Sequence, residues 1–413
     1  MPASNLPRLQ KPAGLFGGVA PDIIGYVTAP RVNRLSLPEH RTWAEVSLPV
    51  LRENFRVVEK HVGGKVTVCA VVKADAYGHG AVGCARALES AGASWLGVTN
   101  AEDALALRYA GIESRLLLLT GMWKGEEDVI TSARLTPTVW DAWHLQLLEK
   151  AAKRHGLVLP VHLKIDTGMH RLGAPKEALP FLCEILTSCE HLELEGVCTH
   201  FASAEVLDAE SGAQQMNCFE EGLAILHRHG FFPGLIHTAN SAAMTARPET
   251  WNTMVRPGIA LYGYSLPFTR EHQAVDIAPL PVRPALTWKT RVLTMKEIAA
   301  GQAVGYGGTY IAHHPGRYAV LAVGYADGYQ RLLSNRGRVI IRGEYAPVIG
   351  RISMDLTTVD VTKIPAVQPG DDVILIGEEN GKSVDALELA GLCETVLYEI
   401  LCGLSQRVPR VYV

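Results

Sequence analysis

One lysine follows directly on a run of strand-forming residues in the segment CAVVKADAYGHG, residues 69–80. This lysine is Lys73, and Tyr77 lies four residues further on, among alanine and glycine. A lysine amine held at the edge of a buried strand can attack a carbonyl carbon and form a covalent Schiff base. The simpler alternative is a surface loop that begins with a lysine, and the residues elsewhere in the chain distinguish the two.

Other polar residues follow apolar runs in the same way. In residues 159–166, His162, Lys164 and Asp166 alternate with apolar residues, so Lys164 is expected to face an interior where an unpaired ammonium group is costly. Arg171 comes shortly after this segment. Further residues at the ends of apolar runs are His200, Asn240, Ser241, Arg256, Gly258 and Ile259.

The apolar runs alternate with longer amphipathic segments between residues 65 and 263. Eight strand–helix units of this kind predict an α/β fold with an N-terminal (β/α)8 TIM-type barrel, in which chemistry occurs at the C-terminal ends of the strands. The eight expected strands are residues 65–73, 94–98, 115–120, 136–140, 159–166, 194–201, 234–240 and 253–263.

The pattern changes near Pro281, after which strand-forming segments predominate. We therefore expect a (β/α)8 barrel over residues 41–281 and a mostly β C-terminal domain over residues 282–413. Residues 1–40 contain six prolines and little periodicity, which indicates an extended or disordered arm. Residues 42–48 alternate like a strand.

The expected barrel suggests a ligand. Barrels often bind phosphate with the loops that follow strands seven and eight, where Ser241 offers a hydroxyl and Gly258 lets the backbone approach closely. Taken alone, Ser241 is more typical of a helix cap and Gly258 of a turn. A lysine on one side of the barrel mouth and a phosphate cradle on the other fit pyridoxal 5'-phosphate.

Composition excludes several other classes. A formal net charge of -3 gives no electrostatic case for nucleic acid or an anionic membrane. No run approaches the roughly 20 apolar residues of a membrane span, and the N-terminal segment lacks the apolar core of a secretory signal. The eight cysteines form no CxxC pair and no His/Cys zinc spacing, so we expect reduced thiols, no metal site and a cytoplasmic location.

From about Thr42 to Val413 the chain resembles the alanine racemase family. AVVKADAYGHG is similar to the family's cofactor-lysine signature, and further family motifs follow in the family's order. These motifs are LKIDTGMHRLG, THFASAE, HTANSAA, MVRPGIALYG, VGYGGTY, VGYADGY, GRISMD and LYEILCGLSQRVPR.

The resemblance implies that Lys73 forms the internal aldimine with pyridoxal 5'-phosphate, and that Lys73 and Tyr306 are acid/base groups on opposite faces of the cofactor. It implies that Arg256 faces the pyridine nitrogen and that His200 connects Tyr306 to Arg256. Asn240 is also assigned to the cofactor site. The implied phosphate ligands are Tyr77, Ser241, Gly258, Ile259 and Tyr398.

The resemblance also implies a substrate site. Arg171 and Met354 would hold the substrate carboxylate, with Arg171 also steadying the cofactor, and Tyr325 would line the entrance. Lys164 is often carbamylated in the family. This chain departs from the family at His170, where glycine is more usual, and in its N-terminal arm.

The implied activity is interconversion of L- and D-alanine, which supplies D-alanine for the bacterial cell wall. The implied assembly is a head-to-tail homodimer with shared active sites. Alternatives are a racemase for serine or a broader set of amino acids, a pyridoxal-phosphate decarboxylase of the same architecture, and a cofactor carrier built from the barrel alone. A decarboxylase would have a carboxylate and a cysteine where this chain has Arg256 and Tyr306, and a carrier would not need the domain bearing Tyr306.

Overall fold

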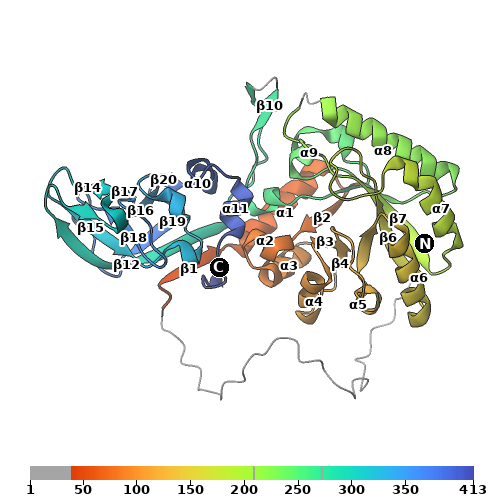
Figure 1. The fold of residues 1–413 in the computed structure, drawn as a ribbon, viewed down its shortest axis with the longest axis horizontal. Helices are drawn as coiled ribbons and strands as arrows, with labels where there is room; N and C mark the ends of the chain where they lie inside the picture. The colour runs from red at the N-terminus through yellow and green to blue at the C-terminus, as the bar shows by residue number, and fades with distance from the viewer. Residues whose placement is uncertain (1–38, 208–209, 271–272) are drawn as a thin grey trace, which may run out of the picture. The chain divides into compact units, whose positions relative to one another are not determined.

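The structure is a computed structural model, and it describes residues 39–207, 210–270 and 273–413. The arm predicted for residues 1–40 lies outside this part of the chain except for its last two residues. Residues 41–413 form one unit, which contains a barrel and a second sheet (Figure 1).

All eight predicted barrel strands are confirmed. Within the described residues they form one parallel sheet in the order β8-β7-β6-β5-β4-β3-β2-β9. Backbone hydrogen bonds from Thr253 N to Ile236 O (3.1 Å) and from Arg256 N to Ala239 O (2.9 Å) connect the two ends of this sheet. The strands are β2 (Thr67–Val71), β3 (Trp95–Val98), β4 (Arg115–Leu118), β5 (Thr136–Val139), β6 (Leu159–Lys164), β7 (Leu192–Cys198), β8 (Leu235–His237) and β9 (Met254–Val255).

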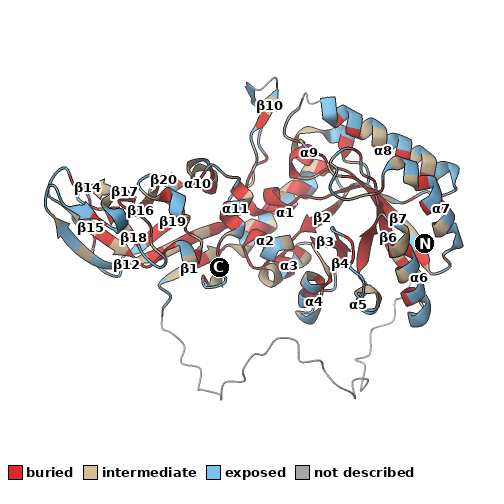
Figure 2. Ribbon diagram, in the orientation of Figure 1, coloured by how far each residue is buried: buried red, intermediate tan, exposed pale blue. Residues whose placement is uncertain are grey.

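Helices cover the outside of the barrel, and the strands inside this helical layer are buried (Figure 2). Along β6 and just beyond it, Val161, Leu163 and Ile165 point to this outer layer and are fully buried, and each such burial contributes roughly 1.5–3 kcal/mol. His162 and Lys164 alternate with them, as predicted. The helices are α1 (Leu48–Val62), α3 (Ala81–Ser90), α4 (Ala101–Tyr109), α5 (Glu127–Ser132), α6 (Ala142–His155), α7 (Leu179–Ser188), α8 (Glu210–Arg228) and α9 (Ser241–Ala246).

The C-terminal part is a second sheet built around the long strand β12 (Leu286–Ile298), as the strand-rich pattern predicted. Two helices, α10 (Ala386–Leu392) and α11 (Leu397–Cys402), interrupt its strands. The other strands of this sheet are β1 (Thr42–Val46), β15 (Gly316–Leu321), β16 (Arg338–Ile341), β17 (Glu344–Pro347), β18 (Thr357–Asp360), β19 (Asp372–Glu379), β20 (Lys382–Val384) and β21 (Arg410–Tyr412). Two short hairpins stand apart from both sheets: β10 (Phe268–Arg270) with β11 (Gln273–Val275), and β13 (Ala303–Val304) with β14 (Tyr310–Ile311).

The first described strand, β1, pairs in the second sheet. The range predicted for the barrel, 41–281, includes this strand, but β1 lies antiparallel to β12 and parallel to β21. Its partners are remote in the sequence, with Trp43 opposite Lys289 and Val46 opposite Tyr412. The alternating pattern of residues 42–48 reports a strand with one buried face, but it carries no information about the partner.

In the described segments no helix combines the length and apolar character needed to cross a bilayer. The same segments contain no cluster of three or more His, Cys, Asp or Glu side chains suited to a metal ion. All eight cysteines carry free thiols.

Candidate active site

Lys73 opens an unusual turn. The strand β2 ends at Val71, so Lys73 is the first residue of the short segment α2 (Lys73–Tyr77) and not the last of the strand, as the sequence suggested. The next residues, 74–77, all have φ between 52° and 54°, which is left-handed backbone. L-residues adopt this conformation at a cost of about 1–2 kcal/mol each, so the surrounding structure must hold the turn.

Three neighbouring elements hold this left-handed turn. At the start of α3, Ala81 N donates to Asp75 Oδ1 at 2.7 Å. From β21, Arg410 Nε donates to Gly78 O at 2.8 Å. The helix α11 lies so close that a Cβ atom added to Gly78 would be 2.1 Å from Leu401 O. The turn that begins at Lys73 is therefore held by both the barrel and the C-terminal part.

A cavity of about 840 Å³ lies at the C-terminal ends of the barrel strands. It brings together the residues that the sequence predicted from the barrel loops, and Tyr398 joins them from α11. The predicted residues that line it are Lys73, Tyr77, Lys164, Arg171, His200, Asn240, Ser241, Arg256, Gly258, Ile259 and Tyr398.

The cavity concentrates positive charge, with four cationic side chains along its lining. Burial lowers the pKa of Lys73, and the nearby guanidinium groups of Arg171 and Arg256 lower it further. Burial likewise lowers the pKa of Lys164, with the same two arginines and Lys73 acting in the same direction. Each shift favours the neutral amine, which is the nucleophilic form.

One side of the cavity is a cradle of hydrogen-bond donors. Gly258 N donates to Ser241 Oγ at 2.8 Å, and a Cβ atom added to Gly258 would lie 2.2 Å from Tyr77 Oη. The Tyr77 ring centre is 5.9 Å from that of Tyr398. Hydroxyl groups gathered in this way, beside a glycine whose backbone can approach closely, suit a phosphate. The residues present therefore fit the phosphate group of pyridoxal phosphate.

The helix that follows this cradle is capped by Asn240 and not by Ser241. Asn240 Oδ1 accepts a hydrogen bond from Ala243 N at 3.0 Å, at the start of α9. The Ser241 hydroxyl is therefore directed to Gly258. The alternative interpretation of Ser241 as a helix cap is thus wrong.

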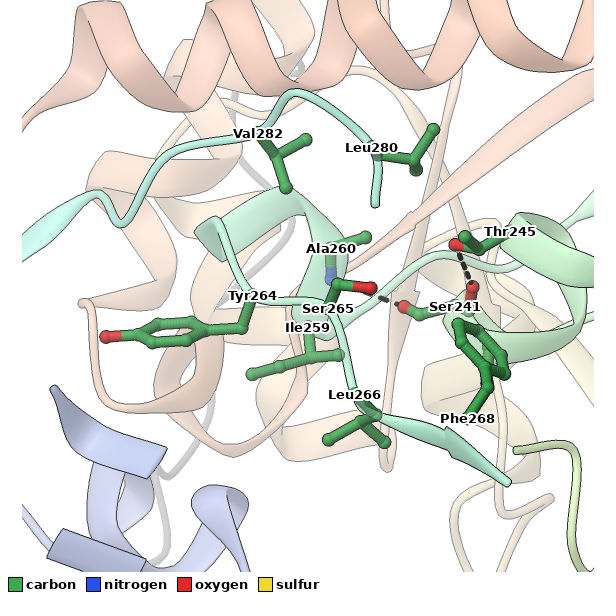
Figure 3. A pocket seen from close by; sticks show the side chains of 11 residues that line it. Ser241, Thr245, Ile259, Ala260, Tyr264, Ser265, Leu266, Phe268, Leu280 and Val282 are labelled. Atoms are coloured by element: carbon green, nitrogen blue, oxygen red, sulfur yellow. Dashed lines mark hydrogen bonds between the residues drawn. The ribbon is translucent and has the colours of Figure 1, made fainter. Parts of the chain in front are cut away.

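A second cavity, of about 10 Å³, shares Ser241 and Ile259 with the large one (Figure 3). Apolar side chains such as Leu280 and Val282 form much of its wall. Its volume admits no more than one water molecule. The larger cavity is therefore the candidate ligand site.

Arg256 lies buried beside the large cavity. Its Nη2 donates to Thr199 O at 2.7 Å and approaches His200 Nδ1 at 3.5 Å. Burial, with the positive charge of Arg256, lowers the pKa of His200 to about 2, so this imidazole is neutral. An arginine does not give up its proton in proteins, so Arg256 brings a fixed positive charge to the cavity.

Three of the predicted residues lie elsewhere. Tyr306, Tyr325 and Met354 are not among the residues that line the cavity, and their side chains are 72%, 43% and 54% exposed. Tyr325 and Met354 come from neighbouring loops, because Ala326 N donates to Met354 O at 2.9 Å. Large exposed apolar side chains on one group of loops are typical of an interaction surface.

His170, the departure from the family pattern, is exposed and has φ of 54°. This is the left-handed region, which glycine adopts without strain. His170 Nδ1 lies 3.6 Å from Asp166 Oδ2, and His170 N donates to Asp166 Oδ1 at 3.0 Å. Asp166 thus anchors the loop that carries Arg171 despite the unfavourable residue.

Two buried histidines near Arg256 were not assigned to the site from the sequence. His237 Nδ1 lies 2.7 Å from Arg256 Nη1, and His162 lies behind His237. The alternation of polar and apolar residues predicted that His162 faces the barrel interior, and this pattern was the one sequence signal for a role near the site. The short strand β8 has no comparable alternation that could identify His237.

We predict that Gly258→Ala weakens the binding of pyridoxal phosphate by roughly tenfold or more. The added methyl group would overlap the Tyr77 hydroxyl and displace a donor from the cradle, and one hydrogen bond to a charged group is worth about 1.5–3 kcal/mol. The measurement is titration of the cofactor-free protein with pyridoxal phosphate, followed by absorbance. Gly234→Ala is the matched control, because a Cβ atom there meets nothing within 4 Å. Equal affinities for the two variants would contradict the cradle.

Comparison with known proteins gives a consistent result. Residues 46–266 match the sequence model "Alanine racemase, N-terminal domain", and residues 285–412 match "Alanine racemase, C-terminal domain". The alanine racemase of Syntrophobacter fumaroxidans is 41% identical over 366 residues, which cover 88% of this chain and 96% of that protein.

Solved structures agree with this match. The alanine racemase of the D-cycloserine-producing Streptomyces lavendulae superposes with a TM-score of 0.85 at 34% identity, covering 91% of this chain and 97% of the other. The alanine racemase of Bartonella henselae, solved with covalently bound pyridoxal phosphate, gives a TM-score of 0.80 at 30% identity, covering 91% and 100%.

Proposed function

The chain belongs to the alanine racemase family, and on that premise we propose that it interconverts L- and D-alanine with pyridoxal 5'-phosphate as cofactor. The observation that carries the proposal is that one cavity is lined both by Lys73 and by the cradle of Tyr77, Ser241 and Gly258. We further propose that this activity operates in the cytoplasm and supplies D-alanine for the cell wall.

The cofactor would be held by groups already in place. Lys73 would be the covalent attachment point, the cradle would hold the phosphate, and Arg256 would be the partner of the pyridine nitrogen. Asn240, which caps α9, lines the same cavity. When bound, pyridoxal phosphate withdraws electrons from the substrate α-carbon and so makes its proton acidic. The Bartonella henselae relative, described with covalently bound pyridoxal phosphate, supports this assignment.

Racemisation requires a proton to leave one face of the α-carbon and another to arrive on the opposite face. Lys73 Nζ serves one face, and its lowered pKa suits an amine that must accept and return a proton near neutral pH. Tyr306 Oη serves the other face. Arg171 and Met354 orient the substrate carboxylate, and Tyr325 lines the path by which substrate enters.

Arg256 governs selectivity in this proposal. It keeps its own proton, so it would not protonate a neighbouring pyridine nitrogen, and the ring of a bound cofactor would be a weaker electron acceptor. Side reactions such as transamination are thereby limited. Neutral His200, 3.5 Å from Arg256 Nη2, connects this guanidinium to Tyr306 in the assembled site.

The site is assembled from two subunits. Tyr306, Tyr325 and Met354 are exposed and do not line the cavity of their own chain, which supports a head-to-tail homodimer. In that arrangement the loops of one chain cover the cavity of the other, and two-fold symmetry produces two equivalent sites.

We predict that Lys164 carries a carbamate. The amine lies close to Arg171, Arg256 and Lys73, where a further cation is unfavourable, and its lowered pKa provides the neutral form that reacts with carbon dioxide. The measurement is electron density at Lys164 in a crystal grown with bicarbonate. Density that ends at a bare amine, with no anion beside it, would contradict the prediction, whereas a chloride ion would support the charge argument but not the carbamate.

The test of the proposed function is an assay of the purified protein with added pyridoxal phosphate. We expect L-alanine and D-alanine each to be converted to an equimolar mixture, measured by loss of optical rotation and by chiral chromatography. Serine and other amino acids are assayed in parallel, and released carbon dioxide is measured. Faster inversion of serine than of alanine would favour the broader racemase, and carbon dioxide release without inversion would favour a decarboxylase.

A further inference from the structure

A buried row of side chains runs through the barrel interior from Arg256. Arg256 Nη1 lies 2.7 Å from His237 Nδ1, and His237 Nε2 lies 2.8 Å from His162 Nδ1. His162 Nε2 lies 3.4 Å from Glu195 Oε2. Both histidines are fully buried. The row therefore connects the candidate active site with a partly exposed carboxylate on β7.

The row ends near the N-terminal ends of the strands, away from the cavity. There Arg115, the first residue of β4, forms a two-point ion pair with Glu195. The Arg115 guanidinium also lies 4.0 Å from the ring centre of Trp95, the first residue of β3. Hydrogen bonds from His162 and Arg115 outweigh the effect of burial and lower the pKa of Glu195 to about 2, so it is a carboxylate.

The chemistry of the two ends fixes the direction of every hydrogen bond in the row. Arginine can only donate, so His237 Nδ1 must be the acceptor and its proton must lie on Nε2. That proton is donated to His162 Nδ1, so the His162 proton also lies on Nε2 and is donated to Glu195. A carboxylate can only accept, which agrees with this order. Burial lowers the pKa of both histidines, which agrees with two neutral rings.

The packing around His162 keeps this ring in place. A Cβ atom added to Gly196 would lie 2.7 Å from the His162 ring, so the ring occupies the space that glycine leaves next to Glu195. The pairing of β6 with β7 shifts register between Val161 and His162. The strand pairing is therefore irregular next to the His162 ring, and the close contact with Gly196 leaves this ring little freedom to rotate.

We propose that Glu195 is a positioning residue for Arg256, acting through the protonation order of His162 and His237 that the carboxylate and the guanidinium together fix. The carboxylate keeps the acceptor nitrogen of His237 towards Arg256 and thereby holds the guanidinium at the cavity, where it would act on the cofactor ring. This inference rests on the proposed function for its catalytic consequence, whereas the order of the protons is independent of any activity.

The first test is the order of the protons in the wild-type holoprotein. Histidine labelled with ¹⁵N distinguishes protonated from bare ring nitrogens by NMR, and His162→Gln and His237→Gln assign the two signals. We expect both rings to be neutral with the proton on Nε2. A proton on Nδ1 of His237, or a doubly protonated ring in the row, would overturn the proposal even if the protein racemises alanine.

The second test is Glu195→Gln. Glutamine offers one acceptor oxygen to two donors, Arg115 and His162, and its amide can donate to His162 and reverse the row. We expect an altered protonation order, with kcat for alanine reduced about tenfold or more and KM within about twofold, because Arg256 faces the cofactor and not the substrate carboxylate. Glu193→Gln, an exposed carboxylate on the same strand, is the matched control.

Arg115→Met distinguishes two roles of Glu195. It removes the ion pair with Arg115 but keeps the carboxylate as the acceptor for His162. This change leaves Glu195 to accept from His162, so we expect the wild-type protonation order and kcat within about threefold. A loss as large as that of Glu195→Gln, or no change in either property for Glu195→Gln, would overturn the proposal. If Glu195→Gln does not fold, the protonation of His162 and His237 measured by NMR in the wild-type protein decides whether the proposal stands. Failure of wild-type protein to racemise alanine would instead refute the proposed function.

Discussion

Lys73→Ala is expected to abolish racemisation, with a loss on the order of 10⁴-fold or more. The change removes both the covalent attachment of the cofactor and the acid/base group on one face of the substrate, and each role contributes separately to the rate. The amine that is lost is the one whose pKa is lowered by burial, so no comparable neutral amine replaces it in the variant. The measurements are steady-state racemisation and mass spectrometry after borohydride reduction, which fixes the cofactor to the wild-type chain.

Lys65→Ala is the control for this change, because Lys65 is an exposed lysine shortly before the same strand. We expect it to retain wild-type activity and the reducible linkage. The cradle is intact in Lys73→Ala, so the variant should still bind pyridoxal phosphate, but without covalent attachment. A borohydride-reducible linkage that persists in Lys73→Ala would refute the assignment.

Mixing two inactive variants is expected to restore activity. Lys73→Ala and Tyr306→Phe homodimers should each be nearly inactive, because every site lacks one of its two acid/base groups. If each site takes Lys73 from one chain and Tyr306 from the other, a heterodimer contains one doubly damaged site and one intact site. Complete exchange at equal amounts makes half of the dimers heterodimers, so recovery should approach about a quarter of wild-type activity.

The control mixes two variants whose changes lie in the same cavity, Lys73→Ala and Arg256→Gln. Each heterodimer site then keeps one damaged residue, so activity should not exceed the sum of the separate variants. Exchange of subunits is verified by native mass spectrometry of chains with different mass labels. Absence of recovery for Lys73→Ala with Tyr306→Phe, after exchange is demonstrated, would mean that both residues serve a site within one chain.

The strands and most of the cavity residues could be predicted from the sequence because their signals are local. A buried parallel strand is a short apolar run, and a polar residue just after it must lie at the barrel mouth. Lys73, Arg171 and Ser241 were found in this way. The proposed relation of Tyr306 to Lys73 comes from the family resemblance, because local patterns carry no information about it.

Features that depend on contacts between distant residues were not predictable. The left-handed backbone of residues 74–77 opposes the local preference of alanine, aspartate and tyrosine, and tertiary contacts maintain it. The pairing of β1 with β12 and β21 depends on strands that are remote in sequence. The partnership of His162 with His237 likewise requires β6 and β8 to be positioned in three dimensions.

The hydrogen bond from Arg410 to Gly78 has a consequence for the synthesis of the protein. These residues are 332 positions apart, so a ribosome that adds about 5–20 residues per second makes them roughly 15–70 s apart. The barrel strands can pair during that interval, but the turn that begins at Lys73 is still without its support from Arg410. We therefore expect nascent chains to acquire the ability to capture the cofactor late in translation, well after the lysine itself has been made.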